Sequence, residues 1–250
     1  LRALDAALAA AASGAVDAIV FAPLNKHAMH LAGLDVEDEL RHMQRAFGVD
    51  GFVSEFNITG AMWTSRVTSH VPLRDVADLI TTDGVVDAVR ILHRYQVAAG
   101  TASPRIAVTA LNPHAGDGGS LGREEIDVIA PAIARVRGEG IDARGPLPSD
   151  TVFVAARRGD YDAVVTMYHD QGQIAMKLLG FERGVTLHGG LPVPIATCAS
   201  GTAFDIVGRN VANVEGLQSA FDIVASIATR NGSVPADPDV SARRPVPVPR

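Results

Sequence analysis

Apolar and polar residues follow two spacings along the first 170 residues, one typical of helices and one typical of buried strands. Helical spacing occurs in residues 1–12, 84–98 and 123–137. Short apolar runs typical of strands occur in residues 17–23, 63–71, 105–111 and 162–168. Helices that alternate with short buried strands predict an α/β protein in which the strands are mostly parallel.

Turn and tail signals complete this outline. Gly14 is expected to end the first helix, and Thr82 is a candidate cap for the helix at 84–98. The interior has no long polar spacer, so any domain boundary is expected in a short loop. Residues 233–250 contain five prolines and little apolar periodicity, which predicts a flexible tail.

Composition and charge narrow the class of protein. Apolar residues make up 47% of the chain and charged residues 20%, which predicts a packed core. The formal net charge of -6 disfavours nucleic acid as a partner, and no apolar stretch is long enough to span a membrane. A single cysteine excludes an internal disulfide framework. With no secretory leader pattern at Leu1, we expect a cytoplasmic protein.

Three of the eight histidines stand where a strand-like segment ends, namely His70, His114 and His169. Ligands of α/β sheets bind beyond the carboxyl ends of the strands, so three imidazoles arriving there from separate strands can converge on one metal ion. The alternative is that these histidines are surface residues or make structural hydrogen bonds. Their placement alone leaves both interpretations open.

Two further segments contain candidate chemistry. Residues 112–125 form a Gly-rich loop that leads into a helix, where free N–H groups can face an anion, although the spacing matches neither a P-loop nor a dinucleotide-binding fingerprint. A simple tight loop is the alternative. Asp170 is a candidate helix cap, and Lys177 near the end of the same helix is either a solvated lysine or a group for proton transfer.

Six segments, in chain order and without large gaps between about residues 17 and 212, resemble one family of enzymes. They are Pro-Leu-Asn-Lys at 23–26, His-Val-Pro-Leu at 70–73, the loop at 112–125, Gly-Pro-Leu-Pro-Ser-Asp-Thr at 145–151, Tyr-His-Asp-Gln-Gly at 168–172 with Lys177, and Gly-Thr-Ala-Phe-Asp at 201–205. The family is that of the 4-hydroxythreonine-4-phosphate dehydrogenases of vitamin B6 (pyridoxine) synthesis and their close paralogues.

The resemblance implies a fold and a chemistry. The fold has two α/β/α domains with an inter-domain cleft, as in isocitrate and isopropylmalate dehydrogenases. The chemistry is NAD- or NADP-linked oxidation of a hydroxy acid followed by decarboxylation, with Zn, Mg, Mn or Co as the divalent metal. The implied assembly is a homodimer that shares its metal site. The implied metal ligands are His70, His114 and His169, with His169 from the opposite subunit; the catalytic residues are Lys177 and Asp170, and the cofactor contacts are Gly201, Thr202 and Asp205.

The positions that bind substrate in the family are altered. Its phosphate-contacting His-Thr-Glu motif aligns with Glu39, Leu40 and Arg41, or with a two-residue gap with residues 37–39. Its substrate-binding asparagine and arginine fall at Thr186 and Ile195, which removes a bidentate anion partner. Arg41 and His188 are candidates to contact a carboxylate instead. We therefore expect a paralogue for a non-phosphorylated or differently placed acid, such as a sugar acid or an aromatic-derived cis-dihydrodiol carboxylate.

The resemblance also predicts the domain layout. Residues 1–30 and 185–232 are expected to form the remainder of a first α/β domain, and residues 31–184 a second domain with the metal site and the dimer interface. About a third of the family's chain, at its N-terminal side, has no counterpart here. Two other classes of function stay open: a metal-assisted hydrolase or acyl-phosphate-binding transferase on a similar frame, and a non-catalytic paralogue or fragment that binds metal or small acids.

Overall fold

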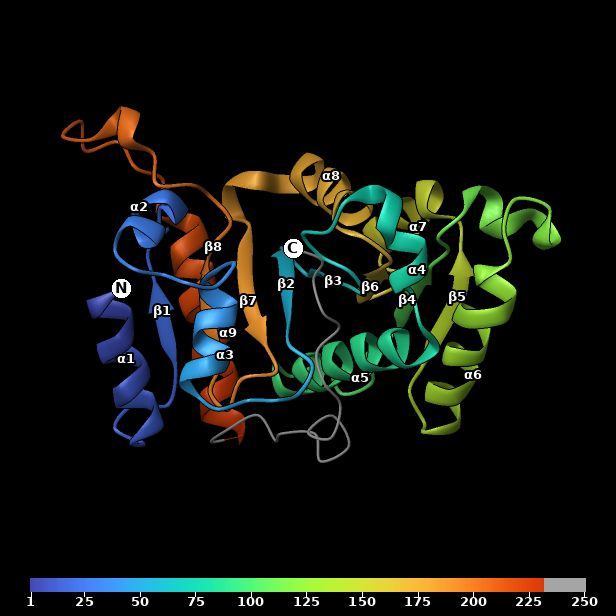
Figure 1. Cartoon of the computed structure of the whole chain (residues 1–250), viewed down its shortest axis with the longest axis horizontal. Helices are drawn as coiled ribbons and strands as arrows, with labels where there is room; N and C mark the ends of the chain where they lie inside the picture. Colours follow the sequence, from blue (N-terminus) through green and yellow to red (C-terminus); the bar gives the residue numbers. More distant parts are fainter. Residues whose placement is uncertain (232–250) are drawn as a thin grey trace. The chain divides into compact units, whose positions relative to one another are not determined.

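The computed structural model describes residues 1–231, so the predicted tail at 233–250 lies outside the described residues. The chain divides into two compact units (Figure 1). Among the described residues, unit 1 comprises residues 1–60, 98–100 and 180–231, and unit 2 comprises residues 61–97 and 101–179. Residues 31–60 thus belong with residues 1–30, whereas the sequence-based layout grouped them with the second domain. Leu34, Leu40 and Met43 explain this, because they are buried in the core that also holds Leu4 and Leu8.

Unit 1 contains a mixed sheet in the order β1-β8-β7-β2, in which only β7 is antiparallel to its neighbours. Its strands are β1 (Ile19–Phe21), β2 (Ser54–Thr59), β7 (Val185–Gly189) and β8 (Ile195–Cys198). Its helices are α1 (Arg2–Ala12), α2 (Lys26–Leu31), α3 (Glu39–Ala46), the 3₁₀ turns η4 (Phe181–Arg183) and η5 (Phe204–Ile206), and α9 (Glu215–Asn231).

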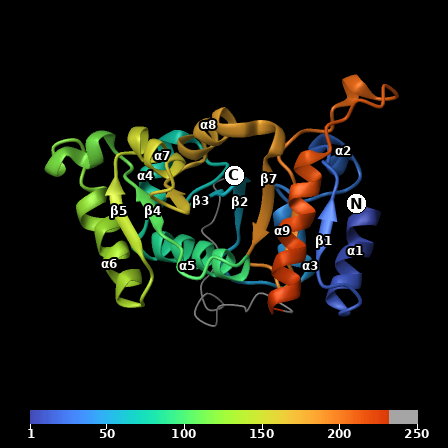
Figure 2. The ribbon, with the colours of Figure 1, turned by 180° about the vertical axis from the view of Figure 1, so that it is seen from behind.

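Helices cover both faces of this sheet, as the opposite views in Figures 1 and 2 show for α3 and α9. The apolar residues of α1 recur at helical spacing, and Leu4, Leu8 and Ala11 pack in one core with Ile19 and Ile195. Helix α9 lies against β1, β7 and β8. Helix α1 thus buries the apolar face that its sequence provides.

Unit 2 contains a fully parallel sheet in the order β3-β6-β4-β5. Its strands are β3 (Met62–Arg66), β4 (Ile106–Thr109), β5 (Ala143–Leu147) and β6 (Ala163–Thr166). The other elements are η1 (Leu73–Asp75), α4 (Val76–Leu79), α5 (Thr82–Ala98), η2 (Pro113–Gly119), the π-helical turn η3 (Glu125–Ile129), α6 (Ala130–Gly138), α7 (Ser149–Arg157) and α8 (His169–Gly180), whose last residue is counted with unit 1.

The core of unit 2 forms where helices cover the parallel strands. Every residue of β4 and β6 is buried, which is typical of strands with both faces covered. Helix α5 buries Val85, Val86 and Val89 almost completely. None of the helices in the described part of the chain has the length and apolar composition that crossing a membrane requires.

The predicted α/β class is confirmed, and parallel pairing predominates within the units. Two details differ from the expectations. The strand predicted at 63–71 ends at Arg66, because the chain turns away and His70 has a φ of 35°. The expected cap Thr82 is the first residue of α5, and the neighbouring Thr81 hydroxyl accepts the N–H of Gly84 instead.

Truncation of the α5 face tests the core of unit 2. Val86 is fully buried, whereas Val154 in α7 is 52% exposed. Val86→Ala should lower the free energy of unfolding by about 2 kcal/mol, because it removes two buried methyl groups and leaves a cavity. Val154→Ala, the same change on a helix surface, should change it by less than about 0.5 kcal/mol. Urea unfolding followed by circular dichroism measures both, and equal losses would contradict this core.

Candidate functional site

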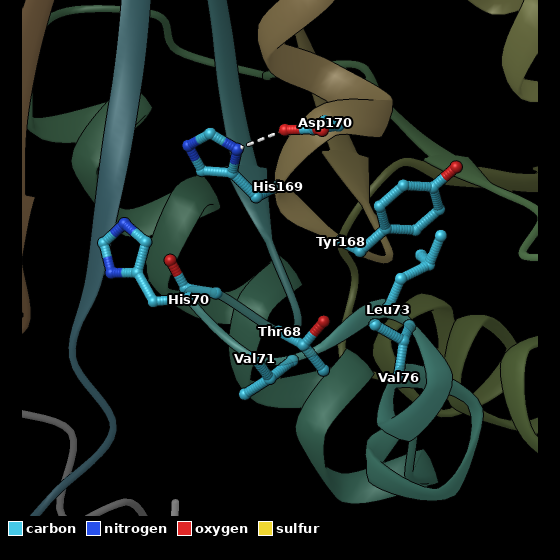
Figure 3. A pocket seen from close by; sticks show the side chains of 9 residues that line it. Thr68, His70, Val71, Leu73, Val76, Tyr168, His169 and Asp170 are labelled. Atoms are coloured by element: carbon cyan, nitrogen blue, oxygen red, sulfur yellow. Dashed lines mark hydrogen bonds and ion pairs between the residues drawn. The ribbon is translucent and has the colours of Figure 1, made fainter.

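A pocket of about 470 Å³ opens in unit 2 at the carboxyl ends of β3 and β6. It is lined by Thr68, Ser69, His70, Val71, Leu73, Val76, Tyr168, His169 and Asp170. Figure 3 shows the two imidazoles on one side of this pocket, with Tyr168 turned away from them toward Leu73 and Val76. One wall of the pocket is therefore polar and the other apolar.

His70 and His169 are the paired groups of this pocket. Their ring centroids lie 5.6 Å apart, and the rings are tilted by 43°. They meet because β3 and β6 are parallel neighbours, with Arg66 in register with Thr166. The resemblance implies that His169 comes from the opposite subunit, whereas the structure places it beside His70 of the same chain.

The carboxylate of Asp170 orients one of these rings. Asp170 Oδ1 lies 2.7 Å from Nδ1 of His169, as the dashed line in Figure 3 shows. A ring whose Nδ1–H donates to a carboxylate has Nε2 available as the ligand atom, an arrangement common around metal-binding histidines. Asp170 was expected as a helix cap; it is the second residue of α8, and its described bond goes to this ring.

His114 lies in a loop with an uncommon backbone. Five consecutive residues from His114 to Gly118 have positive φ values, between 44° and 78°. L-residues seldom adopt this region, so such a run points to a functional constraint. Glycine is required at Gly116, because a Cβ there would lie 2.6 Å from Oε2 of Glu125.

The carboxylate of Glu125 holds the start of this loop through hydrogen bonds. Its side chain is 2% exposed and accepts the N–H groups of Leu111 and Asn112 at 2.8 Å each and the Asn112 amide at 3.0 Å. Burial by itself raises the pKa of the Glu125 carboxyl, but the hydrogen bonds from Asn112 and Leu111 outweigh burial and lower it. Glu125 is therefore a buried anion satisfied by the backbone that precedes His114.

Two of the three expected metal ligands lie together in this structure. Two imidazoles at this spacing can both approach one ion, since a zinc–nitrogen bond is about 2.1 Å long. Within residues 1–231, no group of three or more His, Cys, Asp or Glu side chains is placed to hold a metal ion. The pair His70–His169 fits a divalent ion as a partial site, and the triad with His114 stays a prediction.

Lys177 lies in the last turn of α8 and is exposed. It follows His169 by eight residues, so the two Cα atoms are separated by about 12 Å along the helix axis. Lys177 is not one of the residues that line the pocket around His70 and His169. Its expected role in proton transfer stays a prediction.

The aligned phosphate-binding positions lie at the start of α3 in unit 1. Glu39 is the first residue of α3, and Asp38 caps the helix by accepting the N–H of Arg41 at 3.0 Å. Leu40 is 5% exposed and packs in the core. The Arg41 guanidinium donates to Gln44 at 2.8 Å and lies 3.9 Å from a Glu37 oxygen. This end of α3 thus combines three carboxylates with a single arginine.

The remaining substrate positions lie on β7 and β8. Thr186 is half-buried and lies 3.5 Å from the Asn57 amide. Ile195 is fully buried in the core. His188 is also fully buried, and its ring stacks on Phe21 with a centroid distance of 5.7 Å. The side chains of Ile195 and His188 therefore face the interior of unit 1.

The expected cofactor contacts lie in the segment between β8 and α9. Gly201 and Asp205 are exposed, Thr202 is half-buried, and Ala203 between them has a φ of 47°. The same segment exposes large apolar side chains, with Phe204 at 67%. Figures 1 and 2 both show it extending away from the sheet of unit 1.

Open α/β proteins commonly bind small ligands beyond the carboxyl ends of their strands, and the pocket of this chain lies at that edge. The model of the family described as "Pyridoxal phosphate biosynthetic protein PdxA" matches residues 1–224. The chain therefore belongs to the PdxA family, as its motifs predicted.

Individual relatives support this assignment. The chain is 53% identical over 226 residues to the "Putative 4-hydroxythreonine-4-phosphate dehydrogenase 2" of Pseudomonas aeruginosa, which covers 89% of the chain and 67% of the relative. The crystal structure of 4-hydroxythreonine-4-phosphate dehydrogenase from Klebsiella pneumoniae superposes with a TM-score of 0.77 at 37% identity, covering 91% of this chain and 69% of that one. The chain spans about two thirds of the length of the curated relatives it matches.

Two further structures are similar at lower identity. A terephthalate 1,2-cis-dihydrodiol dehydrogenase from Burkholderia xenovorans has a TM-score of 0.69 at 29% identity, covering 89% of this chain and 71% of that one. A β-decarboxylating dehydrogenase from Thermococcus kodakarensis has a TM-score of 0.55 at 14% identity, covering 86% of this chain and 67% of that one. This last likeness shows the fold alone.

Two residues with structural roles at the site went unrecognised in the sequence. Glu125 is the last residue of the Gly-rich loop 112–125, and Gln171 belongs to the Tyr-His-Asp-Gln-Gly motif, but neither pattern assigns these side chains a role. For Gln171 a signal exists, because a glutamine at the third position of a helix commonly accepts a backbone N–H just before the helix. For Glu125, burial beneath the loop has no signature in a single sequence.

The Glu125 carboxylate should stabilise the protein in a pH-dependent way. In Glu125→Gln an amide N–H₂ faces the Asn112 amide, so we expect a loss of about 2 kcal/mol in the free energy of unfolding at pH 7. Because the folded pKa is lowered, the carboxylate's contribution is complete above the ordinary glutamate pKa of 4.5 and is lost as the pH falls through the folded value. The difference between variant and wild type should therefore shrink in acid.

Urea unfolding at pH 7 and below pH 4 measures this difference. Asp127→Asn is the matched control, because Asp127 is an exposed carboxylate on the same segment that pairs with Arg123 at 2.8 Å. It should change stability by less than about 1 kcal/mol. A Glu125→Gln loss that stays constant between the two pH values would contradict the buried-anion description.

Proposed function

We propose that this chain functions as a dehydrogenase that oxidises the CH–OH group of a small hydroxy acid, using NAD or NADP and a divalent metal ion. The observation that carries the proposal is the pairing of His70 with His169 in a pocket at the strand ends, with Asp170 fixing the ring of His169. Membership of the PdxA family and the dehydrogenase names of its relatives support the reaction class.

In this proposal His70, His114 and His169 hold the divalent ion. When bound, such an ion polarises the substrate oxygen and stabilises the negative charge that develops when a β-carboxylate leaves as carbon dioxide. Asp170 holds His169 in the tautomer that presents Nε2. A bound nicotinamide would supply the hydride acceptor. Lys177 would take the proton of the substrate hydroxyl and return a proton to the carbon that loses carbon dioxide.

The cofactor is proposed to bind at the segment after β8 in unit 1. Gly201, Thr202 and Asp205 supply backbone and side-chain polar groups there, and the exposed apolar residues beside them provide a surface for a planar ring. Reduction of NAD or NADP, followed as an increase in absorbance at 340 nm, separates this proposal from the hydrolase and transferase alternatives, since neither of those reactions reduces a nicotinamide.

A homodimer with a shared metal site is part of the proposal. The family's arrangement takes His169 from the opposite subunit; because His70 and His169 lie together in one chain, the other way to share the site is for His114 to come from the loop 112–125 of a second copy. A site built this way resembles the family's site in using both subunits, with a different histidine crossing between them.

Metal binding tests the histidine pair directly. Wild type should bind about one Zn²⁺ or Co²⁺ per chain, whereas His70→Ala and His169→Ala should weaken binding at least tenfold, since each removes a ligand. His93→Gln is the control, because His93 lies within α5 and does not line the pocket. Equilibrium dialysis with metal analysis measures all four proteins. Wild-type protein without bound metal would contradict the proposed site.

Mixing two inactive variants tests the sharing of the site. In dimers formed from His114→Ala and His169→Ala copies, ligands from different chains would leave one intact site of two whether His114 or His169 crosses between subunits, so dehydrogenase activity should reappear on mixing. Ligands from one chain would leave both sites broken and the mixture inactive.

A second candidate concerns the substrate rather than the reaction. The start of α3 places Glu37, Asp38 and Glu39 around one arginine, and a phosphate dianion is repelled by such carboxylates. The likeness to a structure named terephthalate 1,2-cis-dihydrodiol dehydrogenase also favours an acid without phosphate. A sugar acid or an aromatic-derived cis-dihydrodiol carboxylate is therefore the alternative to a phosphorylated hydroxythreonine.

A matched pair of substrates decides between the candidates. If the carboxylates at α3 face the substrate, kcat/KM for 4-hydroxythreonine should equal or exceed kcat/KM for its 4-phosphate, and Glu39→Gln should raise the rate on the phosphate ester severalfold. Steady-state NADH formation measures both. Faster turnover of the phosphate ester by wild type would exclude the second candidate and retain the first.

A further inference from the structure

The carboxyl ends of β3, β6 and β4 are tied together by side chains beyond the regular ladder. Thr68, just after β3, donates both its N–H and its hydroxyl to the carbonyl of Met167, at 3.1 and 2.8 Å. Met167 follows β6 and is fully buried. This tie fixes the segment that leads to His70 against the segment that leads to His169.

Gln171 makes the second tie, from α8 to β4. Its Oε1 accepts the N–H of Met167 at 2.7 Å and the hydroxyl of Thr109 at 2.8 Å, while its Nε2 donates to the carbonyl of Ala110 at 2.8 Å. The orientation of the amide is determined by these partners, because a backbone N–H requires the oxygen and a backbone carbonyl requires the N–H₂ group. One side chain thus satisfies groups on both strand ends.

Gln171 lies close in sequence to His169, and its partner Ala110 lies close to His114, so its hydrogen bonds affect where both histidines lie. His169 precedes it by two residues in the first turn of α8, and His114 follows Ala110 by four residues. The first turn of α8 also packs closely on β6, because a Cβ at Gly172 would lie 3.2 Å from the Thr166 side chain. Loss of the amide bonds would let α8 and the end of β4 shift relative to each other.

We propose that Gln171 is a positioning residue that sets where His169 lies relative to the strand end that leads to His114. This proposal rests on the proposed function, because it assigns Gln171 the role of holding the histidines in place before the metal ion binds. Residues around metal ligands commonly contribute 10- to 100-fold in metal affinity through such bonds. The effect of Gln171 on the position of the His169 ring is expected in metal-free protein as well.

The test compares the half-buried Gln171 with the buried Gln96, and both receive the same substitution. Gln171→Met removes all three bonds with little change in side-chain length. Gln96→Met is the control: Gln96 is 2% exposed, and its amide donates to the carbonyl of Asp162 at 3.5 Å, just before β6 begins and so at the opposite end of that strand. Both variants should lose some stability to urea, but only Gln171→Met removes bonds near the histidines.

Zinc affinity, measured by competition with a chromophoric chelator, should fall at least tenfold in Gln171→Met and by less than twofold in Gln96→Met. Imidazole ¹⁵N resonances of metal-free protein should shift at His169 in the first variant only. Wild-type affinity and unshifted resonances in Gln171→Met would overturn the proposal, as would equal losses of affinity in both variants.

Failure of the proposed metal site and failure of the positioning role can be told apart. If wild type binds no zinc, the proposed metal site fails, and the imidazole resonances then decide the positioning role by themselves. If Gln171→Met does not fold, Thr109→Val provides the test, because it removes only the Thr109 hydroxyl bond to Gln171. That variant should weaken zinc binding about threefold, the equivalent of a modest hydrogen bond, and unchanged affinity together with unshifted His169 resonances would overturn the proposal.

Discussion

Parallel pairing of β3, β6 and β4 is the constraint on which the candidate site depends. Parallel strands run in the same direction, so the chain must return through a helix after each strand and deliver each carboxyl end to the same edge of the sheet. The register of Arg66 with Thr166, and of Val108 with Val165, places these ends side by side. His70 and His169 therefore meet although they are far apart in sequence, and the loop that contains His114 starts from the same edge.

The backbone beyond these strand ends adopts conformations that require compensation. Residues His114, Ala115 and Asp117 have positive φ values without being glycine, at a cost on the order of 1 kcal/mol each. Glu125 supplies part of the compensation through its bonds to Leu111 and Asn112. The unfavourable backbone conformations and the hydrogen bonds that offset them both lie within this loop and the helical turn that follows it. The loop therefore stabilises its own conformation.

The sequence was sufficient for the class of fold and it singled out His70 and His169, which the structure brings together, but it did not give the arrangement of the site. Periodicity located α5, β4 and β6 to within a few residues, because buried helices and parallel strands leave strong apolar patterns. It overestimated the length of β3. Residues 67–71 contain apolar and β-branched side chains, but the chain leaves the strand there and His70 has a positive φ. The contacts of Gln171 depend on which strands are neighbours, and spacing along one chain does not contain that information.

The positions that match the family's motifs and the positions that depart from them lie in different units. His70, His114, His169 and Lys177 all lie in unit 2, whereas the changed substrate positions at Glu39, Leu40, Thr186 and Ile195 lie in unit 1. Two of these changes are now part of a hydrophobic core, because Leu40 and Ile195 are buried among apolar side chains. A guanidinium introduced at position 195 alone would need either a buried anion or a repacked core, since an unpaired buried charge is strongly unfavourable. Leu40 and Ile195 are thus linked through one core, so a polar side chain at either position would require changes in the apolar residues packed around it.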